Sequence, residues 1–296
     1  MIREEIRRGL TNRLALLGMA ALYAGLVALS WKWLRNPYIL LYVEGETMSR
    51  GSALYALRSF FVLDIWRAYP FLCALPLALT ACDEWNGGYY RLQLCRTPWR
   101  RFVGKRLVAA AIAGGLVLAL PLAAYLGTAV ICDPYDQPYL QLSTELQHIF
   151  NPNAFVRDMS SPILVREYYP LLVDPEPLTW EQVAHLPREA FVRSELAIMG
   201  GSVVGAFVFG ALWSLVALAL SAWTTNRYLV LGLPAVLLGL LPGICVRLGW
   251  IALLPGLLML TLMPLHYGWY FLTAAMEMAL CGTLYCLGIR KRVRHG

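Results

Sequence analysis

Long apolar segments, separated by short polar ones, dominate the pattern of this chain. A helix needs roughly 20 mainly apolar residues to cross the hydrocarbon core of a membrane. Segments that approach or meet this length occupy residues 14–34, 60–83, 102–131, 196–223, 228–246 and 265–289. The second is the least regular, because Pro70 and Pro76 interrupt it. The pattern predicts an all-α polytopic membrane protein with six transmembrane helices.

A further apolar segment precedes the last predicted span. It covers residues 250–263, contains Pro255-Gly256 and is followed by Pro264. About 14 residues are too few for a helix that crosses the membrane. We expect a re-entrant segment of two half-helices that enter the membrane and return, with their broken backbone covered by protein.

The composition is typical of the same class of protein. Hydrophobic residues make up 59% of the 296-residue chain and charged residues 15%, and the mean hydropathy is +0.57. A soluble domain has a more polar composition. We therefore expect one transmembrane domain over residues 14–296.

The distribution of basic residues predicts the orientation of the helices. Lys and Arg are retained in short loops on the cytoplasmic side of a membrane. With both termini inside, the cytoplasmic segments hold 15 of the 25 Lys and Arg residues and four of the 18 acidic residues. The charge balance indicates a multi-pass protein of the cell membrane with cytoplasmic termini, and it gives no reason to propose a nucleic-acid partner.

Residues 1–13 are charged and contain a helical repeat of apolar residues. Ile2, Ile6 and Leu10 recur at four-residue spacing, and Glu4 is placed to pair with Arg8. This pattern predicts an interfacial amphipathic helix that contacts membrane lipids. The basic residues available to lipid headgroups are Arg3, Arg7 and Arg13. An ordinary basic flank that only fixes topology is the alternative.

Residues 133–195 form a long external insertion in this topology. A connection of that length is usually functional or partly structured. It could form a cap that controls the outer exit or contacts a partner. It could equally be a spacer packed on the helix ends.

The residue types of a metal or catalytic centre are scattered. None of the seven cysteines forms a CxxC pair, and the four histidines show no ligand spacing. No paired acids, HExxH, GxSxG or Ser-Lys pair lie within the spans. We therefore expect no metal site and no catalytic residues in this chain.

Glu277 is the only acidic residue well inside a predicted span. A buried ionisable group in a membrane usually faces protein or water because exposure to lipid is costly. Glu277 could contact a cationic or polar substrate, pair with Arg247, or hydrogen-bond a neighbouring helix while protonated. These three roles remain open at this point.

The turn between the second and third spans has an unusual density of charge. Asp83 and Glu84 close the second span, and a Gly87-Gly88 pair follows. The basic residues of this turn are Arg91, Arg96, Arg100, Arg101, Lys105 and Arg106. A simple connector between two spans would be shorter and less charged.

The order of these parts, and this turn in particular, resembles the permease subunits of type-2 ABC exporters. The turn in that family has an acidic residue, a glycine, a short helix with leucines, then basic residues and a lysine. The resemblance implies a coupling helix at about 88–97 that docks on a cytoplasmic ATPase. The residues it assigns to this coupling are Glu84, Gly88, Tyr89, Tyr90, Arg91, Leu92, Leu94, Arg96 and Lys105. The family's usual Gly-Thr pair is replaced, since Tyr89 follows Gly88.

The same resemblance implies where ATP is bound. This chain lacks the GxxxxGK[ST] loop that holds phosphate and magnesium. ATP and Mg would be bound by a partner ABC ATPase, and a second permease, identical or related, would complete the exporter. The substrate would be hydrophobic or amphipathic. A non-transporting membrane scaffold, an immunity protein or an intramembrane enzyme are the alternative functions.

Overall fold

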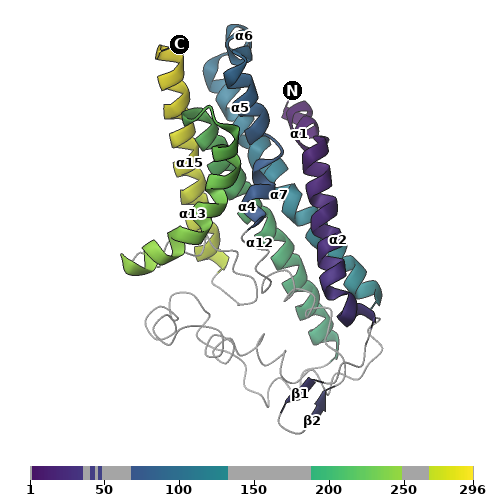
Figure 1. Ribbon diagram of the computed structural model, residues 1–296. Helices are drawn as coiled ribbons and strands as arrows, with labels where there is room; N and C mark the ends of the chain where they lie inside the picture. The colour runs from purple at the N-terminus through teal and green to yellow at the C-terminus, as the bar shows by residue number, and fades with distance from the viewer. Residues whose placement is uncertain are drawn as a thin grey trace.

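The computed structural model describes residues 2–35, 41–43, 46–48, 68–132, 188–248 and 267–295 (Figure 1). This part of the chain is a bundle of helices with one small hairpin of strands. The helices are α1 (Ile2–Leu10), α2 (Arg13–Arg35), α4 (Tyr69–Ala74), α5 (Ala78–Asn86), α6 (Tyr89–Arg96), α7 (Trp99–Cys132), α12 (Arg188–Trp223), α13 (Arg227–Arg247) and α15 (Tyr267–His295). The strands β1 (Leu41–Val43) and β2 (Glu46–Met48) pair antiparallel, and they were not predicted.

Three of these helices are long and apolar enough to cross a membrane. They are Trp99–Ile131 in α7, Met199–Trp223 in α12 and Tyr270–Arg294 in α15. α1 and α2 together would make a fourth, although they meet at an angle of 59°. The predictions of a helical fold and of membrane-spanning helices are thus confirmed, whereas the number of six spans stays a prediction.

The second predicted span is broken within the described residues. α4 ends at Ala74 and α5 begins at Ala78, with a turn over residues 75–77 between them. Pro76 lies in this turn, where it has no backbone N–H to give to a continuous helix. The start of that span at residues 60–67, the re-entrant segment 250–263 and residues 133–187 of the external insertion lie outside the described residues.

The core of the bundle lies between α7 and α12. Tyr125 of α7 and Phe209 and Trp213 of α12 are fully buried there, together with Tyr69 of α4. The two long helices approach closely because glycines face each other. A Cβ added to Gly114 would lie 2.1 Å from the Ser214 Cβ and 2.7 Å from the Gly210 carbonyl oxygen.

Small residues are common where membrane helices pack, since lipid provides no hydrophobic drive between them. The sequence pattern Gly201/Gly205 of α12 is a GxxxG motif of this kind. A Cβ on Gly205 would nevertheless meet nothing within 4 Å, whereas one on Gly210 would lie 2.5 Å from the Gly114 carbonyl oxygen. α12 therefore approaches α7 most closely at Gly210, which lies more than one helical turn beyond the GxxxG motif.

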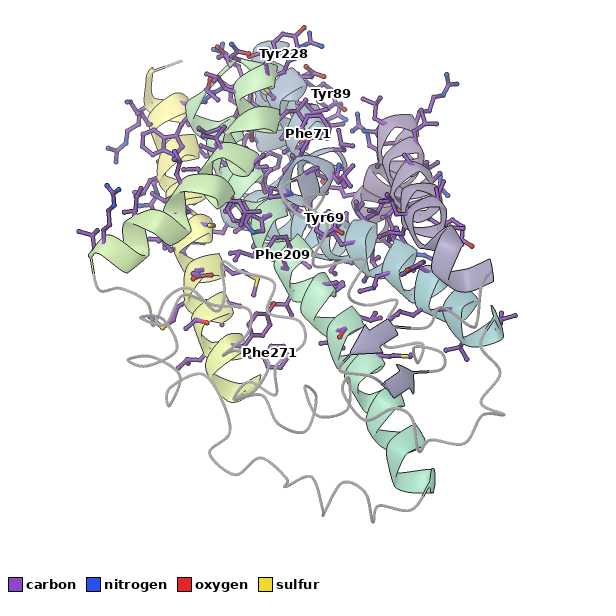
Figure 2. The ribbon with its side chains drawn as sticks, turned by 60° about the horizontal axis from the view of Figure 1, so that its bottom comes forward. Tyr69, Phe71, Tyr89, Phe209, Tyr228 and Phe271 are labelled. Carbon is purple, nitrogen blue, oxygen red and sulfur yellow. The ribbon has the colours of Figure 1, made fainter. Side chains whose placement is uncertain are left out.

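Both chain termini and α6 lie at the same end of the bundle (Figure 1). We call this end the terminal face. α1 packs closely against the turn between α4 and α5. A Cβ added to Gly9 of α1 would lie 3.2 Å from Leu77 and 3.5 Å from Pro76 of that turn. Tyr89 and Tyr228 lie toward this end, whereas Phe271 lies toward the opposite end (Figure 2).

Replacing Gly114 with Ala is expected to destabilise the bundle. The added methyl group would force α7 and α12 apart, and overpacking of this kind costs about 1–3 kcal/mol. Gly127→Ala is the matched control on the same helix, because a Cβ there meets nothing within 4 Å. Thermal unfolding in detergent should show a lower midpoint for Gly114→Ala alone, and equal midpoints for the two variants would contradict the packing at Gly114.

Candidate functional site at the terminal face

The turn between α5 and α7 is built by glycine and proline. α5 ends where the N–H of Gly87 donates to the Asp83 carbonyl at 2.9 Å and Gly88 takes a φ of 70°. Glycine enters this left-handed region without a steric penalty. α6 ends at Thr97, which has extended backbone, as expected for a residue before proline. The short helix therefore occupies Tyr89–Arg96, within the predicted range 88–97.

An ion pair between Glu84 of α5 and Arg106 of α7 closes this turn. The two side chains are only 10% and 9% exposed, so the pair is largely shielded from solvent. The same guanidinium group donates to the Gln93 side-chain oxygen of α6 at 3.2 Å. Arg106 thus joins all three helices of the turn.

A second arginine reaches Glu84 from the N-terminal helix. The Arg8 guanidinium donates to Glu84 Oε1 at 3.1 Å, which ties α1 to the same carboxylate. The pair between Glu4 and Arg8 that the sequence suggested stays a prediction. The two carboxylate oxygens of Glu84 contact two different arginines of this chain. Its main role is therefore to hold the turn together.

Tyr90 is the residue whose predicted role the structure corrects. We expected it to project from the helix into a partner, but it is 8% exposed and packs in the core of the terminal face. Its ring lies 4.3 Å from the ring of Trp85, centroid to centroid. Tyr90 therefore holds α6 against α5 and is not available to an external groove.

Two other apolar residues of α6 are accessible. Tyr89 is 50% exposed and Leu92 is 61% exposed. Leu94 is partly buried and packs against the core below the helix. Of the basic residues in the predicted set, Arg91 donates to the Tyr90 hydroxyl at 3.3 Å, Arg96 is exposed and Lys105 is partly buried.

The turn between α12 and α13 lies beside α5. Asn86 donates through its side-chain amide to the Thr225 carbonyl at 2.9 Å, and the Cys82 thiol donates to the same oxygen at 3.4 Å. Two turns that are distant in sequence are thereby joined at the terminal face. Tyr228, in the first turn of α13, is 77% exposed next to this junction.

Glu277 lies in the membrane-length part of α15. Both of its carboxylate oxygens are buried, and neither has a hydrogen-bond partner among the described residues. Arg247, which the sequence offered as an ion-pair partner, is exposed at the end of α13, and no ion pair joins it to Glu277 within the described ranges. Of the three roles that the sequence left open for Glu277, pairing with Arg247 is thus not seen among the described residues.

The comparisons with known proteins give no identity for this arrangement. No family model matches the chain, and no curated protein or solved structure matches it. The geometry of the terminal face and of α15 is therefore the basis for the function of this chain.

Sequence reasoning missed several residues that build this site. Arg106, Arg8 and Gln93 form the polar network, and Trp85 provides the surface on which Tyr90 rests. One feature of the sequence could have pointed to Arg106, which stands at the start of a strongly apolar segment. A basic residue that is buried at such a position needs a polar partner. The spacing between Arg106 and Glu84 gave no clue, because the two residues meet only through the fold.

Replacing Glu277 with Met is expected to stabilise the protein. A buried carboxyl group without a partner costs about 1–3 kcal/mol, and Met has a similar length without the polar atoms. Thermal unfolding in detergent should give a higher midpoint than for the unchanged chain. Glu195→Met, in the polar part of the sequence before the core of α12, serves as the control. A lower midpoint for Glu277→Met would mean that the carboxyl group is satisfied and structural.

Proposed function

We propose that this chain is the transmembrane permease subunit of an ATP-driven exporter of the ABC type. The observation that carries the proposal is the α5–α6–α7 turn. It presents a short helix on the terminal face, fixes it from beneath through Glu84, Gln93 and Arg106, and leaves Tyr89 and Leu92 exposed. A short helix that is held firmly on its inner side and exposed on its outer side is suited to dock on a partner and to transmit force.

The partner in this proposal is a cytoplasmic ABC ATPase. Tyr89 and Leu92 would enter an apolar groove of that subunit, because aromatic and aliphatic anchors in a pocket provide most of the binding energy of an interface. The exposed Arg96 at the end of α6 would face acidic residues around the groove. ATP and Mg would be bound by the ATPase, since this chain lacks a phosphate-binding loop.

The terminal face would then be cytoplasmic. This agrees with the concentration of Lys and Arg in the segments that meet there, including the C-terminal residues Arg290, Lys291, Arg292 and Arg294. A second permease, identical or related, would complete the transporter in the cell membrane. Six spans, with the re-entrant segment before α15, are part of this proposal.

Glu277 would serve the transported substrate. Its buried oxygens have no partner among the described residues and lie in a helix of membrane-crossing length, and such a group usually serves an ion or substrate pathway. A hydrophobic or amphipathic substrate with a polar or cationic group would fit this site. The stability cost of the carboxyl group would be offset only when the substrate is present.

Replacing both Tyr89 and Leu92 with Ala is expected to abolish association with the ATPase. Both side chains are exposed, so their loss should leave the fold intact, whereas interface anchors cost about 2 kcal/mol or more each when truncated. The measurement is affinity purification in mild detergent, with identification of the accompanying proteins by mass spectrometry. Cys95→Ala, at an exposed position of the same helix, is the matched control.

An ATPase with a phosphate-binding loop should accompany the unchanged chain and the Cys95→Ala variant and be depleted with the double variant. Co-purification of such an ATPase at equal yield with all three would contradict the role of α6. Absence of any ATPase from the unchanged chain would count against an exporter and in favour of a membrane scaffold.

A further inference from the structure

The C-terminal end of α15 is fixed to the terminal face by aromatic rings. Three consecutive basic residues each lie over a tryptophan from a different helix. The pairs are Arg290 with Trp99 at 5.5 Å, Lys291 with Trp223 at 5.4 Å and Arg292 with Trp85 at 5.5 Å, from charged group to ring centroid. A cation over an aromatic ring is attracted by the negative face of the ring.

Arg292 makes a second contact. Its Nε donates to the carbonyl oxygen of Ala222 at 2.6 Å, in the last turn of α12. Carbonyl groups in a last turn have no partner within their own helix and carry partial negative charge. Arg292 is therefore held by the end of a helix and by an aromatic ring.

α15 is seated tightly on α12 at the same level. A Cβ added to Gly288 would lie 2.8 Å from the Ala222 Cβ and 2.9 Å from the Trp223 indole nitrogen. The Trp223 indole N–H also donates to the Leu284 carbonyl at 3.0 Å. The end of α15 therefore follows any movement of the end of α12, with little space for sliding.

The ring under Arg292 is also the ring that supports α6. One side of Trp85 contacts Tyr90 of α6, and the Arg292 guanidinium lies over the same indole. Trp85 itself is 5% exposed and packs within the buried cluster of the terminal face. A continuous series of contacts thus runs from Tyr90 through Trp85 and Arg292 to α15, without following the chain through α7.

We infer that Arg292 is a positioning residue that transmits displacement of α6 to the last helix, α15. This inference rests on the proposed function, in which an ATPase moves α6. α15 carries Glu277, 15 residues before Arg292 and so about four helical turns away. A movement of α6 would therefore reorient the helix that bears the buried carboxyl group, in addition to the helices α5 and α7 that adjoin α6 in sequence.

The test measures a distance at the opposite end of the bundle. Spin labels are placed at Ile131 of α7 and Leu272 of α15, which are 82% and 50% exposed, in a chain whose native cysteines are replaced. The complex with the co-purifying ATPase is compared before and after trapping with ATP and orthovanadate. Arg292→Gln removes the charge and the Nε donor, and Arg294→Gln is the matched control at an exposed position two residues further on.

The inference predicts that trapping shifts the distance in the unchanged complex and in Arg294→Gln, and that Arg292→Gln binds the ATPase but loses the shift. A full shift in Arg292→Gln would overturn it, as would loss of ATPase binding in that variant, which would assign Arg292 to docking. A bound ATPase with no shift in the unchanged complex would also overturn it. These results leave the proposed function standing, whereas absence of ATPase binding to the unchanged chain contradicts both.

A second variant covers the case in which Arg292→Gln does not fold. Trp85→Leu removes the ring but keeps an apolar side chain, so it should bind the ATPase and lose the shift in the same way. Trp85→Phe keeps a ring for Arg292 and Tyr90 and should restore the shift. A full shift in Trp85→Leu would overturn the inference.

Discussion

The ion pair between Glu84 and Arg106 is the interaction on which the terminal face depends. Glu84 ends α5 and Arg106 lies two turns into α7, so the pair closes the turn that carries α6. Arg8 from α1 and Gln93 from α6 complete the network. Removing one partner of such a shielded pair leaves the other charge buried and uncompensated, which costs about 3–5 kcal/mol. Four helices are therefore positioned by one carboxylate and its arginines.

Two different kinds of packing serve the two parts of the molecule. In the centre of the bundle, α7 and α12 meet through Gly114 and Gly210, where backbone touches backbone and no polar group is needed. At the terminal face, the contacts are charged and aromatic, with tryptophans beneath arginines. The first kind brings two long helices to a short distance, whereas the second ties the ends of α5, α7, α12 and α15 together.

The length of the apolar segments predicted the helical membrane fold, and the resemblance of the charged turn to a known family implied the short helix after Gly88. The sequence did not reveal that Tyr90 is buried or that Glu84 pairs with Arg106, because both contacts depend on how the helices pack against one another. Tyr89 and Tyr90 are the same residue type, and only the packing around Trp85 shows which of them faces inward. The role of Glu277 stayed open in the sequence, since charge and depth alone do not show which helices come together.

The most direct test of this account is hydrogen exchange of the α6 backbone in Glu84→Gln, with the exposed Asp83→Asn as the matched control. If the ion pair holds the turn between α5 and α7, amides of residues 89–96 should exchange on the order of 100-fold faster in Glu84→Gln, and at the unchanged rate in Asp83→Asn. Equal protection of α6 in both variants would contradict the account, because the helix would then be held in place without the pair.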